Sequence, residues 1–561
     1  METAATMRTD QITLDQAGQM SVPELFRARV EETPGKLAVH TVQGAMTFAD
    51  WQRRSNGLSL HLRDAIGSLR GERVCLWMTN DEAANFVSAL QSIFDHGGVS
   101  VALDDRFSAL EAARILKESD PKALLIGPQV AERLGEAGRD QLGISGWDPG
   151  AEGWAAGVVP VAGGAVAGGA GFWFAENAGE EDFAPLASPG EMALIAWTSG
   201  STGAPKGAIW KSSDIVQYAE RVANATYSVP RGDRSLSAGD VLQSPIPLHT
   251  AASLIENIYP TVYAGCELIF EGRRFDAEES EQRMEAHRTT IYNGVPAMYA
   301  LMCNLEREHR DARPELMVTS GSPTTADLYR RMRERWPSAS IANWYGLNES
   351  GTGQTLNHGA DMERAPGAIG KPLEPTEVRV VDADLEPVPA GTEGDLLMRG
   401  PGQMTEYFRN PEQTAARFRG DWLFTGDRVV AEEDGLLHVV GRNEERINRG
   451  GFKFYPAEIE SALEEHEGVR EAAVIAVPDP IMGQDAVGFV VLSGDEDLDE
   501  DALRAHLRER IAPNKVPGRI ILVDEFPRGA YGKVIRRKLL ERYEATESRP
   551  EQSTKTIGDA K

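Results

Sequence analysis

Short apolar runs alternate with longer amphipathic stretches over most of this chain. Four such runs predict buried strands, at residues 73–78, 98–103, 122–127 and 266–271. Between the first two, the sequence DEAANFVSALQSIFDHG carries apolar residues at helical spacing. A strand, a helix and a second strand in this order form a βαβ unit, and repeated units form parallel sheets covered by helices. The sequence therefore predicts an α/β fold with mostly parallel sheets.

The pattern changes near residue 440. A helix is predicted over 456–466, strands over 471–477 and 487–492, a helix over 500–511, a strand over 519–526 and a helix over 534–543. A chain of 561 residues also exceeds what one compact core usually holds. We expect an N-terminal tail (1–21), a large N-terminal domain (22–440), a small α+β C-terminal domain (441–544) and a disordered tail (545–561).

Composition excludes several classes of function. The formal net charge of −28 argues against nucleic-acid and anionic-membrane partners. The three cysteines are few and widely spaced, and the first twenty residues lack the apolar core of a signal peptide, so we expect reduced thiols in a cytoplasmic protein. The uncharged segment 154–174 holds six glycines and a proline, which favours a surface loop or linker over a membrane span.

A loop rich in glycine and hydroxyl residues lies between two apolar runs. The sequence TSGSTGAPKG covers residues 198–207, and ALIAW before it and GAIW at its end predict flanking strands. The usual nucleotide loop, G-x-x-x-x-G-K-[ST], instead joins a strand to a helix. Backbone N–H groups of a glycine-rich turn can nonetheless converge on an anion, and Lys206 adds a positive charge. The loop therefore predicts phosphate binding, with a plain hairpin turn as the alternative.

Four further segments carry polar residues that the local pattern does not require. They are NWYGLNESG (343–351), WLFTGD (422–427), GRNEERINRGGFKFYPAEIE (441–460) and PRGAYGKVIRRKLL (527–540). Taken singly, each has an ordinary interpretation. Glu349 can be a solvated loop carboxylate, Asp427 can cap a turn, and Lys533 can be one more cation of a basic helix.

Together and in this order, the five segments resemble the adenylate-forming superfamily of acyl- and aryl-CoA synthetases, peptide-synthetase adenylation domains and luciferases. The family patterns are [ST]-S-G-[ST]-T-G-x-P-K-G, Y-G-x-T-E, T-G-D, G-R-x-x-[DE]-x-I and P-R-x-x-x-G-K. The resemblance covers residues 22–543, with two departures. The family usually has threonine at the position of Asn348, and the glycine-rich segment 143–185 matches poorly, so its role is open. The resemblance implies a large adenylating domain, a small mobile C-terminal domain, and ATP, Mg²⁺ and CoA as partners in the reaction.

The resemblance also implies a role for each matched residue. Lys533, Glu349 and Lys206 are the expected catalytic residues, with Glu349 binding Mg²⁺ and Lys533 stabilising the attack of a carboxylate on the α-phosphorus of ATP. Glu444 occupies the hinge, and Gly450 and Gly451, followed by Phe452, line the tunnel for the thiol. The expected nucleotide-binding residues are Thr198, Ser199, Gly200, Ser201, Thr202, Gly203, Lys206, Gly321, Ser322, Pro323, Tyr345, Gly346, Asn348, Asp427 and Arg442.

The acid and its acceptor are less constrained. His249 and Gly346 are expected in the acid pocket, although His249 can equally be a polar core residue. Amino-acid-activating domains usually have aspartate at this position, so an α-amino acid is disfavoured. We expect a free-standing ligase that joins an aromatic or medium-length carboxylic acid to CoA.

Two other readings remain open. One is transfer of an acyl group, or of another oxyanion such as nitrite, to an amine or a separate carrier protein. The other is a non-enzyme of this fold, against which the intact Lys533, Glu349, Asp427 and Lys206 argue. The sequence also leaves open whether the chain forms a homodimer.

Overall fold

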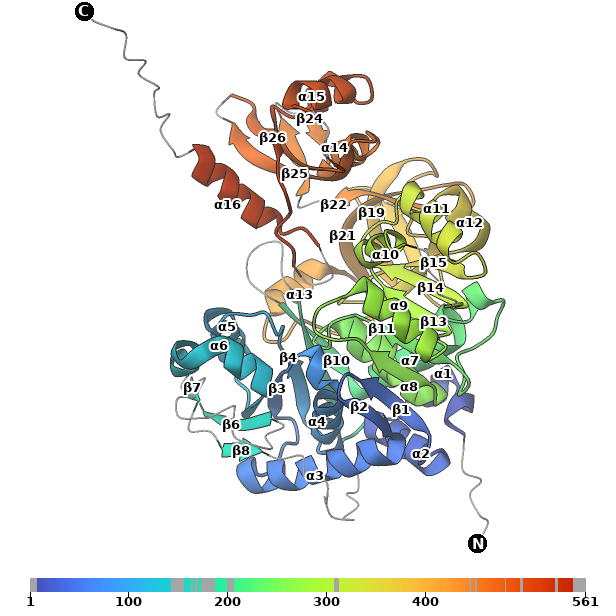
Figure 1. The fold of residues 1–561 in the computed structure, drawn as a ribbon, viewed down its shortest axis with the longest axis vertical. Helices are drawn as coiled ribbons and strands as arrows, with labels where there is room; N and C mark the ends of the chain where they lie inside the picture. Colours follow the sequence, from blue (N-terminus) through green and yellow to red (C-terminus); the bar gives the residue numbers. More distant parts are fainter. Residues whose placement is uncertain are drawn as a thin grey trace, which may run out of the picture. The chain divides into compact units, whose positions relative to one another are not determined.

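Figure 1 shows the fold of the protein in a computed structural model. The structure describes residues 8–142, 156–162, 165–166, 170–172, 187–198, 206–306, 312–442, 445–449, 452–479, 481–494, 498–529 and 533–547. The chain divides into two compact units. Unit 1 consists of Met1–Gly391, Leu396–Thr425 and Ala431–His438, and unit 2 of Thr392–Asp395, Gly426–Val430 and Val439–Lys561.

The larger sheet of unit 1 has nine strands in the order β17-β16-β15-β14-β13-β11-β12-β1-β2. Its six central strands, from β15 to β1, run parallel, whereas the outer strands pair antiparallel. The strands are β1 (Leu37–Thr41), β2 (Gly44–Thr47), β11 (Val241–Ser244), β12 (Glu267–Phe270), β13 (Ile291–Gly294), β14 (Leu316–Ser320), β15 (Ser340–Leu347), β16 (Gly351–Asn357) and β17 (Lys371–Pro372).

The second sheet of unit 1 follows the order β10-β9-β4-β3-β5-β6-β7, with β8 beside β6. β4, β3 and β5 are parallel, as the βαβ pattern predicts. The four strands predicted from apolar runs are confirmed as β3, β4, β5 and β12. The strands are β3 (Arg73–Trp77), β4 (Val99–Ala102), β5 (Ala123–Ile126), β6 (Ala156–Ala162), β7 (Ala165–Val166), β8 (Ala170–Phe172), β9 (Met192–Thr198) and β10 (Lys206–Lys211).

Two segments of unit 1 differ from the sequence expectations. The segment 154–174, expected as a loop or linker, includes the strands β6, β7 and β8, and β6 extends the sheet by antiparallel pairing with β5. The valines of β6 favour extended backbone and outweigh its glycine and its proline. In the expected N-terminal tail, Thr13 caps α1 (Leu14–Ala17) through a reciprocal bond with Gln16, and Ile12 and Ala17 are buried in the core.

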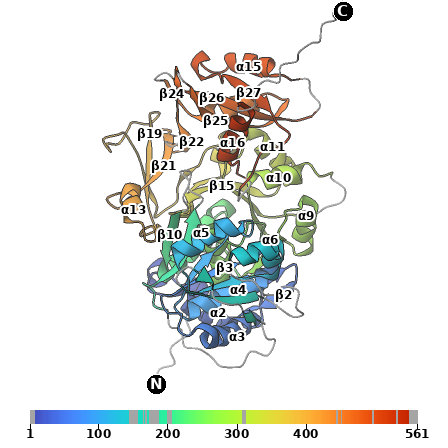
Figure 2. The same cartoon turned by 90° about the vertical axis from the view of Figure 1, so that its left-hand side faces the viewer.

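Helices cover the two sheets of unit 1. In Figures 1 and 2, α5 and α6 lie side by side next to β3, and the three elements share one apolar cluster with β4 and β5. The helices of this unit are α2 (Val22–Glu32), α3 (Phe48–Ile66), α4 (Ala83–Asp95), α5 (Ala109–Ser119), α6 (Pro128–Gln141), α7 (Ser212–Arg221), α8 (Tyr259–Ala264), α9 (Ala277–Ala286), α10 (Pro296–Cys303), α11 (Ala326–Arg335), α12 (Gly359–Arg364) and α13 (Pro411–Arg417). Among the described residues, no helix is long and apolar enough to cross a membrane.

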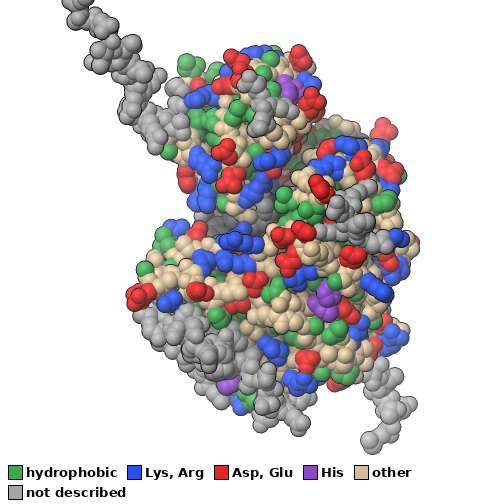
Figure 3. Space-filling model, in the orientation of Figure 1, with side chains coloured by type: hydrophobic (Ala, Val, Ile, Leu, Met, Phe, Trp, Pro, Cys, Tyr) green, Lys and Arg blue, Asp and Glu red, His purple; other side chains and the backbone are tan. Residues whose placement is uncertain are grey.

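A third sheet has the order β18-β19-β21-β20, with β22 beside β21, and the boundary between the units passes through three of its strands. These strands are β18 (Glu377–Val381), β19 (Glu393–Arg399), β20 (Phe418–Arg419), β21 (Trp422–Ala431) and β22 (Leu437–Arg442). On the face of the molecule in Figure 3, acidic and basic side chains are interspersed, so the net negative charge is not gathered in one patch of that face.

Unit 2 is a small α+β unit, as expected. Its sheet has the order β24-β23-β26-β25 with β27 beside β26. Successive residues of β25 point to opposite faces, so Val474 packs in the cluster with α14 and α15, and Ile475 in the cluster with α16. The elements are β23 (Ile447–Arg449), β24 (Phe452–Phe454), α14 (Pro456–Glu464), β25 (Val469–Asp479), β26 (Gly483–Leu492), α15 (Glu500–Arg508), β27 (Arg519–Leu522) and α16 (Arg536–Glu547).

Candidate active site

The expected phosphate loop joins β9 to β10, two antiparallel strands in which Lys206 lies opposite Thr198. This confirms the strand–loop–strand pattern. Residues 199–205 lie outside the described residues, and with them Ser199, Gly200, Ser201, Thr202 and Gly203. At the end of the loop, the Lys206 ammonium lies over the ring of Tyr407, with Nζ 5.7 Å from the ring centroid.

Glu349 lies in the turn between β15 and β16 and is buried. The Tyr407 hydroxyl donates a hydrogen bond to its Oε1 at 2.5 Å, and Arg417 Nη2 lies 3.4 Å from the same oxygen. The backbone carbonyl of Glu349 accepts from the Met404 N–H at 2.7 Å. A buried carboxylate needs such partners, because an unpaired charge in the interior is strongly unfavourable.

The segment 404–408 connects this carboxylate to the phosphate loop. The Ile209 N–H donates to the Glu406 carbonyl at 3.0 Å, and the Phe408 N–H donates to the Gly207 carbonyl at 2.7 Å. β10 is also tied to the Glu349 turn, because Trp210 Nε1 donates to the Asn348 carbonyl at 3.2 Å. These hydrogen bonds bring Lys206 and Glu349, which are far apart in the sequence, into one site of unit 1.

The residues expected around adenine lie at the carboxyl ends of two neighbouring parallel strands. Ser320 of β14 pairs in register with Trp344 of β15, so Gly321, which follows Ser320, lies close to Tyr345. Gly321, Ser322 and Pro323 are exposed, whereas Tyr345 and Gly346 are half-buried. Ligands of open α/β sheets bind at this edge. The arrangement therefore offers a surface on which a flat ring can lie.

His249 forms a polar cluster with two aspartates of unit 1. His249 Nε2 lies 3.5 Å from Asp104 Oδ2, while Arg106 bonds Asp104 at 2.6 Å and Arg273 bonds Asp105 at 2.8 Å. Burial lowers the pKa of His249 although Asp104 raises it. Burial raises the pKa of Asp104, but the charges around it outweigh this and lower the value to about 2. The charge of His249 contributes most to this lowering, followed by the hydrogen bond and the charge of Arg106.

This cluster is the one group of donors among the described residues whose spacing suits a metal ion, with ligand atoms within 4.8 Å of one another. The guanidinium groups of Arg106 and Arg273 already neutralise both carboxylates. We therefore interpret the cluster as a set of ion pairs.

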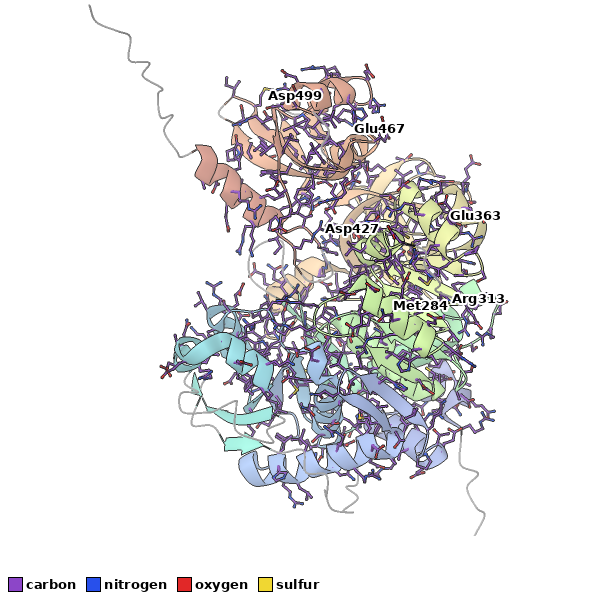
Figure 4. The ribbon with its side chains drawn as sticks, in the orientation of Figure 1. Met284, Arg313, Glu363, Asp427, Glu467 and Asp499 are labelled. Atoms are coloured by element: carbon purple, nitrogen blue, oxygen red, sulfur yellow. The ribbon has the colours of Figure 1, made fainter. Side chains whose placement is uncertain are left out.

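Unit 2 holds a second group of expected site residues. Asp427, labelled on β21 in Figure 4, is buried, and Arg442 Nε donates to its Oδ1 at 2.9 Å. The Lys533 side chain is exposed. Desolvation by the surrounding protein and the charge of Arg442 nevertheless lower its pKa to about 8, while Asp427 and Glu445 act in the opposite direction.

Arg536 of α16 connects this helix to α14 and β25 through hydrogen bonds. It donates to Glu460 of α14 at 2.7 Å and to the Val474 carbonyl of β25 at 3.2 Å, and it lies 3.3 Å from Glu445. Glu444, the expected hinge residue, lies outside the described residues, as do Gly450 and Gly451. β23 and β24 are described on either side of those glycines and pair with Arg449 opposite Phe452.

Sequence reasoning missed Tyr407 and Arg417. Tyr407 lies in an irregular segment, and Arg417 is the last residue of a seven-residue helix, α13. The one available signal was the short sequence YFRNPEQT, in which two aromatic residues and an arginine precede the Asn-Pro start of a helix. That signal marks a turn and does not indicate which residue the tyrosine contacts.

Comparison with known proteins defines the family. The profile named AMP-binding enzyme matches residues 26–408, and the profile named AMP-binding enzyme C-terminal domain matches residues 458–533. A feruloyl-CoA synthase of an Amycolatopsis species is 30% identical over 523 residues, which cover 92% of this chain and 97% of that protein. A 2-succinylbenzoate–CoA ligase of Geobacillus kaustophilus is 29% identical over 521 residues, with the same two coverages of 92% and 97%.

Solved structures share the fold over nearly the whole chain. ATP-bound MatB from Rhodopseudomonas palustris has a TM-score of 0.79 and 26% identity, covering 94% of this chain and 100% of MatB. The two units and the matched profiles define an adenylate-forming enzyme. The chain belongs to the AMP-binding enzyme family, and the resemblance found in the sequence is confirmed.

Proposed function

We propose that this protein is an ATP-dependent acid–CoA ligase. A carboxylate oxygen of the acid attacks the α-phosphorus of ATP, and pyrophosphate leaves as acyl-AMP forms. The thiol of CoA then attacks the acyl carbon, AMP leaves, and the thioester is released. The observation that carries this proposal is that Lys206 and Glu349 both contact Tyr407 in unit 1, in a chain of which 92% is similar to CoA ligases.

The acceptor is assigned to CoA because the relatives of matching length are named as CoA ligases. The fold alone does not decide this point, since the amide bond synthetase McbA shares it with a TM-score of 0.76 and 24% identity. Transfer to an amine or a separate carrier protein is not favoured, because the relatives of matching length are CoA ligases. We propose an aromatic carboxylic acid as the substrate, since the relatives include feruloyl-CoA, indoleacetate–CoA and 2-succinylbenzoate–CoA enzymes.

In the proposed reaction, Lys206 binds the outer phosphates of ATP, Tyr345 stacks on adenine, and Asp427 accepts hydrogen bonds from the ribose hydroxyls. Lys533 supplies the positive charge that offsets the negative charge gathering on the oxygens around phosphorus. All four roles follow from the motifs, and Arg442 supports the role of Asp427 by holding its carboxylate in place.

Glu349 is the residue that would hold Mg²⁺. The donor set fits this ion, because Oε1 is engaged by Tyr407 and Arg417 while Oε2 has no hydrogen bond within the described part of the chain. When bound, Mg²⁺ would neutralise phosphate charge. It prefers few carboxylates and several phosphate or water oxygens, as one glutamate would offer.

The test is pyrophosphate release over a panel of aromatic and aliphatic acids, with and without CoA, and mass spectrometry of the products. We expect release with at least one aromatic acid and a thioester when CoA is added. Acyl-AMP that forms but yields no thioester with CoA would overturn the assigned acceptor. Release confined to aliphatic acids would overturn the assigned substrate class.

A further inference from the structure

Tyr407 contacts two residues to which the proposed function assigns phosphate binding and metal binding. Its hydroxyl bonds Glu349 Oε1 at 2.5 Å, and its ring lies beneath the Lys206 ammonium, 5.7 Å from Nζ to the centroid. Its side chain is buried. A phenol bonded to a carboxylate is a charge-assisted pair, and a cation within about 6 Å of a ring centroid is attracted to its face. One side chain thus touches both the expected metal ligand and the expected phosphate-binding lysine.

The backbone holds Tyr407 rigidly. Its N–H donates to Thr414 Oγ1 at 2.9 Å, and its carbonyl accepts from the Asn410 N–H at 3.1 Å. Both partners lie at or within the short helix α13, whose start Asn410 caps by accepting from the Gln413 N–H. The residue on either side of Tyr407 bonds β10. A side chain anchored in this way can orient another group with little loss of entropy on binding.

We propose that Tyr407 is a positioning residue that fixes Glu349 through Oε1 and so presents Oε2 to Mg²⁺, while its ring orients Lys206 toward the phosphates. This inference rests on the proposed function, since it assigns the metal to Glu349. Arg417 Nη2 also lies 3.4 Å from this oxygen, so Glu349 cannot turn Oε1 toward a ligand without losing both partners. The carboxylate therefore binds the ion through one oxygen, which suits the strict octahedral geometry of Mg²⁺.

The experiment replaces the hydroxyl and keeps the ring, with Tyr407→Phe. Binding of Mn²⁺ in the presence of α,β-methylene ATP is measured by electron paramagnetic resonance, because Mn²⁺ prefers the same oxygen ligands as Mg²⁺. We expect the Mn²⁺ concentration at half-saturation to rise about tenfold, the effect of losing one charge-assisted hydrogen bond. Affinity for the nucleotide at saturating Mn²⁺ should change little, because the ring beneath Lys206 remains. Tyr407→Leu should weaken both.

Two controls separate positioning from a general loss of structure. Tyr329→Phe removes a hydroxyl from α11, away from these contacts, and should leave Mn²⁺ binding unchanged. In a Glu349→Gln background, Tyr407→Phe should have no further effect on Mn²⁺ binding if the hydroxyl acts through the carboxylate.

Unchanged Mn²⁺ binding in Tyr407→Phe, or equal effects in both backgrounds, would overturn the proposal. The measurement uses neither acid nor CoA, so it stands even if the acid–CoA assay fails.

Discussion

The charge of Lys533 should set the alkaline limit of acyl-AMP formation. Its pKa is lowered to about 8, so about nine-tenths of the side chain is protonated at pH 7 and about one-tenth at pH 9. Because the reaction gathers negative charge around phosphorus, only the protonated form assists it. The rate of acyl-AMP formation should therefore fall about tenfold between pH 7 and pH 9. For a lysine with the ordinary pKa of 10.5, the same fall in the rate of acyl-AMP formation would occur more than two pH units higher.

The assay is single-turnover pyrophosphate release without CoA, since ionisation of the thiol would add its own pH dependence. Lys533→Arg keeps a charge at all these pH values, so its slower rate should stay level from pH 7 to pH 9. Lys533→Ala should lose about 10²–10³ in rate at pH 7. Thioester formation from preformed acyl-AMP should be much less affected in both variants. An alkaline fall that persists in Lys533→Arg would assign the titration to another group and refute the reasoning.

Two further predictions test the other contacts. Glu349→Gln keeps the shape of the side chain but loses its charge, so the Mg²⁺ concentration at half-maximal activity should rise while the KM for ATP at saturating Mg²⁺ changes less; an unchanged Mg²⁺ titration would place the metal elsewhere. Arg536→Met should lower the free energy of unfolding by about 1–3 kcal/mol, because it leaves the Glu460 carboxylate without its cation. Urea denaturation measures this change, and Arg537→Met, at a more exposed position of the same helix, is the matched control.

The fold could be predicted because its signals are local. The strands β3, β4 and β5 are buried on both faces, so each appears in the sequence as a continuous apolar run. Their parallel order follows from the helices between them. The strand β6 was missed because glycines on both sides of its valines weaken the same signal. In addition, β6 is stabilised by pairing with β5, a strand about thirty residues earlier, and the local sequence around β6 does not show this partner.

The site could be predicted only as far as its motifs reach. Lys206, Glu349, Asp427 and Lys533 stand in segments whose glycines and spacing mark them. Tyr407 stands in no such segment, and its role depends on contacts with residues about sixty and two hundred positions away in the chain. The same holds for Arg417 and Arg536, whose partners lie on other elements. Motifs thus identify the groups that meet the substrate, whereas the residues that orient those groups emerge only from tertiary structure.

These orienting residues also explain how an acidic protein can bind anions. The net charge of −28 repels ATP at long range, so attraction must come from cations held close to the nucleotide. At two of the expected contacts, a carboxylate and a cation occur together. Glu349 is bonded by Tyr407 and approached by Arg417, and Asp427 is bonded by Arg442. Both carboxylates are buried, so salt screens these contacts less than it screens surface charges. Binding of an anion therefore does not require a positive protein surface. A fixed cation next to the bound nucleotide acts at short range and in a medium of low dielectric constant, where its attraction is strong.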